Sequence, residues 1–170
     1  GAAERLDAKL GGITVAIAPA PAVPHEQHQA WQSLTRVPLH ILPGKTYEMM
    51  AAADLLLVKS GTSTLEAGII GTPMIVTYKV SLLSGLLAHL LLRTPYCSLT
   101  NLVAGRALVP ELLQSKATPK NIARVALSLI REGGLDRMAR ELAAEIRPRL
   151  GEPGAPGRAA DEILALIRSK

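Results

Sequence analysis

The sequence is poor in aromatic residues: it has no phenylalanine, one tryptophan and three tyrosines, although 48% of its 170 residues are hydrophobic. The apolar residues are mainly Ala, Leu, Ile and Val, which favours a core of aliphatic helices and parallel strands over an aromatic β-sandwich. A single cysteine, Cys97, excludes an internal disulfide and is typical of a reducing compartment. The length predicts one domain with a sizeable core.

Long apolar runs and common cofactor motifs are also missing. No uninterrupted apolar run approaches the roughly 20 residues that a membrane-spanning helix needs, and no N-terminal secretory signal pattern appears. The sequence has no G-x-x-x-x-G-K-[ST] phosphate loop, no G-x-G-x-x-G dinucleotide fingerprint and no D-x-D motif. The formal net charge of +5 predicts an anionic partner without identifying it.

Short apolar runs alternate with helical patterns over the first 80 residues, and helical patterns alone follow them. This order is typical of an α/β fold, a Rossmann-like, doubly wound parallel sheet with C-terminal helices. We therefore expect a single domain over residues 1–170, with the sheet core in residues 1–80 and a mostly helical part in residues 81–170. Strands are expected at residues 13–18, 38–42, 55–58 and 74–78. Helices are expected at residues 2–10, 25–34, 46–53, 63–70, 82–92, 105–114, 119–131, 135–150 and 159–169.

The beginning of this pattern is unusual. A parallel α/β domain normally opens with a strand and its phosphate-facing loop, whereas this sequence opens within a helical pattern that closes at Gly11-Gly12. We interpret this order as that of a fragment of a larger protein, from which the first βα unit is missing.

The segment LLLVKSGTSTLEAGIIGTPMIVTY (Leu55–Tyr78) places a cluster of hydroxyl groups and one carboxylate between two apolar strands. Ligands of open parallel sheets bind beyond the carboxyl ends of the strands, which is where this cluster falls. Gly61 lets the backbone approach a ligand closely, and the free N–H groups that open the next helix favour a phosphate. The Glu66 carboxylate, one helical turn further, suits a sugar diol. The candidate binding residues are therefore Ser60, Gly61, Thr62, Ser63 and Glu66, with Thr64 as a further hydroxyl donor.

A purely structural role for the same residues stays open at this point. Ser63-Thr64-Leu65-Glu66 matches the capping box S-x-x-E, in which the glutamate returns to the backbone amide of the serine. The local motif alone does not decide between a nucleotide site and a helix cap.

A longer run, from Gly44 to Gln114, resembles the C-terminal, nucleotide-binding half of lipid-A-disaccharide synthases, which are two-domain (GT-B type) glycosyltransferases. Of its three matching motifs, the one at Ser98–Gln114 is specific to this family, whereas the one at Ser60–Glu66 is shared with other nucleotide-sugar glycosyltransferases and epimerases. The resemblance is close from residue 38 to residue 114 and loose over the helical tail. The motifs are S-G-T-x-T-L-E at Ser60–Glu66, P-M-x-V-x-Y at Pro73–Tyr78 and S-L-x-N-L-x-A-G-R-x-L-V-x-E-L-L-Q at Ser98–Gln114.

This resemblance implies an inverting, UDP-dependent hexosyltransferase that moves diacylglucosamine from UDP onto a lipid-linked glucosamine 1-phosphate in lipid A biosynthesis. It implies that Ser60–Thr62 face the diphosphate and that Glu66 contacts the ribose. Asn101 and Arg106 would line the same cleft, with Arg106 reaching a phosphate. The implied partners are the UDP-sugar donor, the lipid acceptor and the family's N-terminal domain, with no cofactor, metal or nucleic acid. The implied location is the cytoplasm, with peripheral contact to the inner membrane.

Two parts of the family's pattern are absent from the sequence. One is the Gly-Ser-Arg phosphate loop before the first helix; the other is the N-terminal domain, which would supply the acceptor pocket and the catalytic base. We therefore expect the chain to bind part of a donor and to catalyse nothing alone. Two other functions stay open. A related enzyme acting on another sugar would lack the Asn101–Arg106 segment, and a non-catalytic α/β binding domain would not bind UDP.

Several residues outside these motifs invite a binding role that the sequence does not support further. His25 and His28 lie three apart in PHEQHQ, but the additional ligands of a metal site are missing around them. Lys45 and Lys59 either reach a phosphate or point into solvent. Cys97 is expected to be a small buried hydrophobe.

The segment SLLSGLLAHLLLR (Ser81–Arg93) is apolar on nearly every helical face, which exceeds what one core-facing stripe requires. Burial between the sheet and the C-terminal helices is one explanation. The alternative is contact with a bilayer or with the acyl chains of a lipid substrate, with Lys79 and Arg93 near anionic headgroups.

Overall fold

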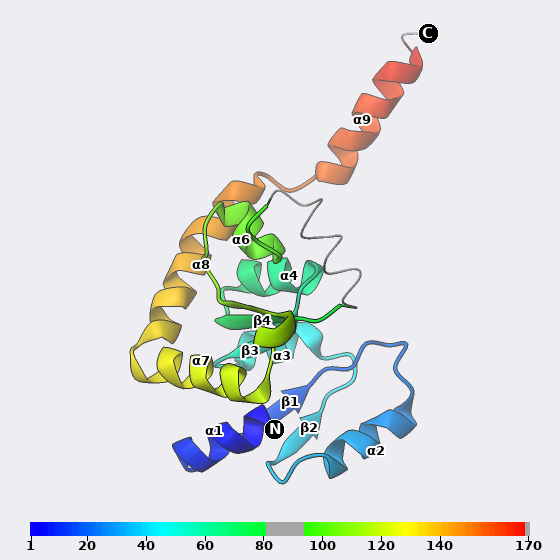
Figure 1. Ribbon diagram of the computed structural model, residues 1–170. Coiled ribbons are helices and arrows are strands. Elements are labelled where there is room, and N and C mark those ends of the chain that lie inside the picture. Colours follow the sequence, from blue (N-terminus) through cyan, green and yellow to red (C-terminus); the bar gives the residue numbers. More distant parts are fainter. Residues whose placement is uncertain (81–93, 169–170) are drawn as a thin grey trace.

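The computed structural model describes residues 1–80 and 94–168, apart from the side chains of His25 and Gln29 (Figure 1). The helix predicted at residues 82–92, and the choice between core and membrane for Ser81–Arg93, lie outside the described residues. In the described part the strands pair in parallel, which confirms the predicted α/β class.

The strands form two small sheets. In one, β1 pairs with β2; in the other, β4 lies between β3 and β5. Each parallel neighbour is reached through a helical connection, as parallel strands require. The strands are β1 (Val15–Ile17), β2 (Leu39–Ile41), β3 (Leu56–Lys59), β4 (Met74–Tyr78) and β5 (Glu111–Leu113).

Helices connect and cover these strands. The helices predicted at residues 2–10 and 119–131 begin and end as expected, and most others differ by one to a few residues at their ends. The helices are α1 (Ala2–Leu10), α2 (His25–Ser33), α3 (Thr46–Ala52), α4 (Thr62–Ile70), α6 (Leu99–Ala104), the short 3₁₀ helix η1 (Gln114–Lys116), α7 (Pro119–Arg131), α8 (Gly134–Leu150) and α9 (Ala155–Arg168).

The sheet of β3, β4 and β5 is covered on both faces, which makes the fold doubly wound. Met74 and Val76 of β4 face one side, where they lie in a buried cluster with residues of α4, α6 and α8. Ile75 points to the other side and packs in a second cluster with Ala126 of α7 and Leu6 of α1. Because neighbouring residues of a strand point to opposite faces, a strand covered on both faces reads as a continuous apolar run.

The prediction of a helix at residues 105–114 is wrong. The helix of this region, α6, ends at Ala104, and Gly105 closes it in the left-handed conformation with φ 69°. The chain then turns into β5, which adds to β4 as a third strand. Pro110 lacks the N–H that a helix interior needs, and its carbonyl accepts a hydrogen bond from Val76 at 2.9 Å. The strand signal of Glu111–Leu113 is too short to stand out in the sequence.

The last helix, α9, stands apart from the rest of the molecule (Figure 1). It contributes no buried residue, and Ile163 and Ile167, one turn apart, are 58% and 65% exposed. None of the described helices combines the length and apolar character needed to cross a membrane.

Candidate functional site

The candidate site begins where β3 ends and α4 begins. The backbone N–H of Ser60 donates to Thr77 of β4 at 3.3 Å, so the sheet reaches this edge. Gly61 follows with φ 155° and ψ −164°, a backbone conformation that residues with side chains rarely adopt. A Cβ atom on Gly61 would meet no atom within 4 Å. Glycine is therefore required by the backbone here, and the space before it is open.

The first turn of α4 presents backbone donors to this open space. Gly61 is the N-cap, and no side chain of the described residues caps the helix. Thr64 turns its hydroxyl inward to the Gly61 carbonyl at 2.7 Å. Within the part of the chain that the structure describes, the backbone N–H groups of Thr62 and Ser63 have no acceptor. Such unpaired amides at the positive end of a helix attract anions.

The start of α6 lies beside the start of α4. The Ser60 hydroxyl donates to the backbone carbonyl of Cys97 at 2.8 Å, and the Cys97 thiol lies 3.3 Å from the Ser60 hydroxyl oxygen. Within the first turn of each helix, the Thr100 hydroxyl donates to the Thr64 carbonyl at 2.6 Å. These bonds fix the two helix N-termini next to one another at the carboxyl edge of the sheet.

The Glu111 carboxylate, which comes from β5, occupies the start of α6. It accepts hydrogen bonds from the backbone N–H groups of Cys97 at 2.8 Å and Ser98 at 2.9 Å, and from the Ser98 hydroxyl at 2.7 Å. The side-chain amide of Asn101 donates to the same carboxylate at 2.8 Å. A negative charge at a helix N-terminus is stabilising, so α6 carries its own anion within the chain. Among the described residues no acidic side chain occupies the start of the neighbouring α4, so its N–H groups are the ones left for a ligand.

Glu66 lies one turn into α4 and contacts α3. The Tyr47 hydroxyl donates to the Glu66 carboxylate at 3.2 Å, and this bond raises the pKa of Tyr47 above its ordinary value of 10. The capping box considered for Ser63 and Glu66 is wrong, because the helix begins at Thr62 with Gly61 as its N-cap. Tyr47 holds one oxygen of Glu66 and leaves the second without a recorded partner among the described residues.

Asn101 has a structural position. It is 1% exposed. Its amide group donates to Val109 O at 2.9 Å and to Glu111, while its carbonyl accepts from the N–H groups of Leu108 at 2.8 Å and Val109 at 2.9 Å. These bonds join α6 to the loop that leads into β5. The resemblance implied that Asn101 lines the cleft; the structure instead places its side chain in the interior.

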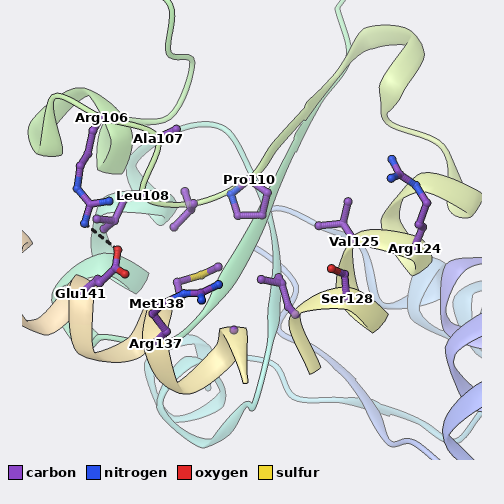
Figure 2. Close-up of a pocket in the computed structure, with 13 residues that line it drawn as sticks. Arg106, Ala107, Leu108, Pro110, Arg124, Val125, Ser128, Arg137, Met138 and Glu141 are labelled. Carbon is purple, nitrogen blue, oxygen red and sulfur yellow. Dashed lines mark hydrogen bonds and ion pairs between the residues drawn. The ribbon is translucent and has the colours of Figure 1, made fainter. Parts of the chain in front are cut away.

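Arg106 lies at the far end of α6 from Ser98, so the structure does not bring it together with Ser60. Its guanidinium pairs with Glu145 and with Glu141 of α8, the latter at 2.7 Å (Figure 2). The hydrogen bond to Glu145 contributes most, and that to Glu141 next, to raising the pKa of Arg106. The same bond lowers the pKa of Glu145 below its ordinary value of 4.5.

The remaining candidates also have partners within the chain. Lys45 pairs with Glu48 at 2.9 Å on the surface. The Lys59 ammonium lies 5.6 Å from the centre of the Tyr78 ring. Cys97 is half-buried beside Ser60, as described above. His28 is buried and lies against Trp31, and the described residues contain no group of three potential metal ligands.

The sequence indicated no role in this region for Tyr47, Glu111 or Cys97. Cys97 was expected to be a buried hydrophobe, but it is half-buried and its thiol lies 3.3 Å from the Ser60 hydroxyl oxygen. Tyr47 is 19 residues away in sequence from its partner Glu66, and Glu111 is 10 to 14 residues away from the residues at the start of α6 that it binds. Cys97 and Ser60 are separated by 37 residues. Glu111 lies within the third motif of the resemblance, so that motif was the available signal; nothing in the sequence pointed to Tyr47.

Comparison with known proteins identifies the family. Residues 1–153 match the family model described as lipid-A-disaccharide synthetase. The lipid-A-disaccharide synthase of Anaeromyxobacter sp. (strain K) is 42% identical over 98% of this chain and 44% of its own length. The lipid-A-disaccharide synthase of Solibacter usitatus (strain Ellin6076) is 44% identical over 78% of this chain and 35% of its own length. That of Myxococcus xanthus (strain DK1622) is 38% identical over 98% of this chain and 43% of its own length. The chain thus spans less than half the length of these relatives, and it belongs to the lipid-A-disaccharide synthase family.

Proposed function

We propose that this chain is the UDP-sugar-binding part of an inverting glycosyltransferase that moves diacylglucosamine from UDP onto a lipid-linked glucosamine 1-phosphate. The observation that carries the proposal is the contrast between the two helix N-termini at the candidate site. Glu111 occupies the start of α6, whereas the amides of Thr62 and Ser63 at the start of α4 are open to a ligand.

The donor's diphosphate would lie against Gly61 and the first turn of α4. Negative charge develops on this diphosphate as UDP leaves the sugar, and N–H groups that are already aimed at it stabilise that charge without reorganising. The Ser60 hydroxyl donates a hydrogen bond to the Cys97 carbonyl and the Ser60 backbone N–H donates to Thr77, so Ser60 would hold the loop in place and not donate to the diphosphate. The hydroxyls of Thr62 and Ser63 supply the side-chain donors.

The ribose would lie over Glu66. A carboxylate can accept hydrogen bonds from both hydroxyls of a diol, and the Tyr47 hydroxyl holds one of its oxygens in place. This arrangement leaves the second oxygen for the sugar and fixes the rotamer of Glu66 before the ligand arrives, which lowers the cost of binding.

Other steps of the reaction belong to other parts of the enzyme. The relatives are more than twice as long as the stretch this chain matches, and we assign the acceptor pocket and the catalytic base to their remaining half. The 170-residue chain is then inactive alone. We place the enzyme in the cytoplasm, in peripheral contact with the inner membrane, because its acceptor would be a lipid.

The test uses the single cysteine as a reporter. Because the Cys97 thiol lies 3.3 Å from the Ser60 hydroxyl oxygen, a ligand on the first turn of α4 should slow alkylation of Cys97 by iodoacetamide. We expect protection by UDP and none by uridine, which lacks phosphates. An unchanged alkylation rate at millimolar UDP would count against the site. Affinity should be weak, since each charge-assisted hydrogen bond that the other half would supply contributes about 1.5–3 kcal/mol.

A further inference from the structure

The two sheets of the molecule do not join, and β1 has one free side. Among the described strands it pairs with β2 alone. The Val15 N–H donates to the Pro38 carbonyl at 3.0 Å, and the Ile17 carbonyl accepts from the Leu42 N–H at 2.9 Å. Because successive residues of a parallel strand direct their backbone groups to opposite sides, the N–H and C=O of Ala16 point away from β2.

Strand β3 also has one free side. Among the described strands it pairs with β4 alone. The Leu56 N–H donates to the Pro73 carbonyl at 2.9 Å, and the Ser60 N–H donates to the Thr77 carbonyl at 3.3 Å. By the same alternation, the N–H and C=O of Leu57 point away from β4.

The side chains of both strands are apolar but poorly covered. β1 lies in the run ITVAIA (Ile13–Ala18), of which no residue is buried. Leu57 is 56% exposed, whereas Ile75, its register partner on β4, is 1% exposed. Ile75 has a strand on either side, and Leu57 has a strand on one side only. A parallel strand with a continuous apolar sequence normally has both faces covered, so β1 and β3 have the sequences of interior strands in the positions of edge strands.

The two sheets lie in one layer between the same helices. α1, which leads into β1, places Leu6 in the cluster that covers Ile75 on one face of the larger sheet. α3, which follows β2, places Met50 in the cluster on the opposite face, and the Met50 carbonyl accepts from the Thr72 hydroxyl at 2.8 Å. Since β4 occupies one side of β3, the smaller sheet lies toward the free side of β3, with β1 nearer to it than β2 (Figure 1).

We propose that one further strand, contributed by the part of the enzyme that this chain does not contain, lies between β1 and β3 and joins the two sheets into one. In a common doubly wound order the first strand lies at the centre, between the second and the fourth. β1 and β3 take the places of the second and the fourth, so the inserted strand is the first. The relatives are more than twice as long as the stretch that this chain matches, and the segment that precedes this stretch in them supplies the strand.

The position defines the chemistry of this segment. It is apolar throughout, because helices cover both faces of the layer, and it runs parallel to β1, because a helical connection joins parallel neighbours. Its end therefore lies at the same edge of the sheet as the end of β3, and the loop that follows it lies beside Ser60 and Gly61. Open parallel sheets bind ligands where the first and fourth strands part. This loop would then complete the nucleotide site, a step that rests on the function proposed above.

The first experiment extends the chain at Gly1 with the residues that precede the matched stretch in the Anaeromyxobacter synthase, about 20 of them, enough for a strand and a loop. Hydrogen exchange is followed by NMR. The amides of Ala16 and Leu57 should exchange at least about 10-fold more slowly than in the chain alone, because they gain hydrogen-bond acceptors. Ile41 is the internal control: its neighbour Leu42 donates to β1, so the Ile41 N–H points away from β1 and should exchange at an unchanged rate.

The matched control carries the same extension with two prolines in the expected strand, which cannot donate to their neighbours, and should leave Ala16 and Leu57 unprotected. Equal protection by both extensions, or protection by neither, would overturn the proposal. Protection of the same amides in the unextended chain that rises with protein concentration would show that a second copy takes this position, and would overturn it as well.

A second measurement tests the burial of Leu57. Leu57→Asn should change the melting temperature of the chain alone little, because this side chain is 56% exposed. In the extended chain it should lower the melting temperature by about 4 °C or more, because the inserted strand covers Leu57. Leu34→Asn is the control, since Leu34 is 73% exposed and lies outside both sheets; its effect should be the same in the two chains. Equal effects of Leu57→Asn in the two chains would refute the insertion.

UDP protection of Cys97 separates the strand from the nucleotide site. The extended chain should be protected from iodoacetamide at about 10-fold lower UDP than the chain alone, because the added loop supplies further hydrogen bonds to a charged ligand. Protected amides at Ala16 and Leu57 with unchanged UDP protection would support the strand and refute the role of its loop. Unprotected amides would refute the strand, whatever the effect of UDP.

Discussion

Replacing Glu111 with glutamine should destabilise the chain, because the Glu111 carboxylate accepts four hydrogen bonds around the start of α6. Glutamine has nearly the shape of glutamate but offers one oxygen instead of two. If that oxygen takes the place that bonds Ser98 and Asn101, the new NH₂ group faces the N–H of Cys97, which donates to the carboxylate at 2.8 Å in the native chain. One hydrogen bond is then lost, and the other three become hydrogen bonds to a neutral acceptor, which are weaker than those to a carboxylate.

The size of the effect follows from the difference between charged and neutral hydrogen bonds. A bond to a charged group contributes about 1.5–3 kcal/mol and a neutral one about 0.5–1.5 kcal/mol. Bonds within one network do not add, so we expect the free energy of unfolding to fall by about 3 kcal/mol rather than by the full sum. For a chain of this length, that loss lowers the melting temperature by about 6–12 °C.

Thermal unfolding followed by circular dichroism measures this change. Glu132→Gln is the control, because Glu132 is exposed and accepts one hydrogen bond, from Ser128 at 2.9 Å; its melting temperature should barely move. The protection of Cys97 by UDP should weaken in Glu111→Gln, measured well below its melting temperature, since Cys97 sits between Glu111 and Ser60. A Glu111→Gln variant that melts with the native chain would refute the view that this carboxylate holds α6 in place.

Three further predictions concern charge at the two edges of the sheet. Glu66→Gln should leave the melting temperature nearly unchanged but weaken UDP binding by about 10-fold or more, because a hydrogen bond to a charged acceptor is lost; calorimetric titration measures the affinity, and an unchanged affinity would remove Glu66 from the site. UDP affinity should be the same with and without magnesium, since the amides of α4 supply the electrostatic stabilisation; a strong dependence on magnesium would contradict this. The pKa of Glu145 is lowered by Arg106, so its ion pair stabilises the fold above the ordinary value of 4.5 and is lost as the pH falls below it. The native chain should therefore lose more stability between pH 5 and pH 3 than Arg106→Gln does, measured by urea unfolding, and equal losses would show that this surface pair contributes nothing.

Much of the sheet could be predicted from the sequence because the evidence for it is local. Met74–Tyr78 is apolar throughout, as a strand covered on both faces must be, and the glycine and proline residues around it mark its ends. The prediction failed between residues 99 and 114, where α6 and β5 are six and three residues long. Strands β1 and β2 are as short as β5, but they lie in apolar runs that mark them in the sequence. Strand β5 begins with the charged residue Glu111 directly after Pro110, so no apolar run marks it, and α6 is too short for a period of 3.6 to be recognised.

The candidate site was predicted in part for the same reason. Gly61 and the start of α4 follow from the order of strand, glycine and hydroxyl residues. The positions of Asn101 and Arg106 do not follow, because each depends on partners that only the fold brings near. Asn101 meets the loop before β5, and Arg106 meets Glu145, which is 39 residues away in sequence. A shared motif can identify such residues as important without saying whether they touch a ligand or hold the chain.

The detached position of α9 has a consequence for cooperativity. The helix is 14 residues long, contributes no buried residue and is joined to α8 by the segment GEPG, whose glycine and proline residues do not continue a helix. Isolated helices of that length are marginal in water, so α9 should open and close while β4 and α8 stay folded. Hydrogen exchange would then divide the chain into two units: rapidly exchanging amides in α9, and amides in β4 that exchange only when the whole domain unfolds.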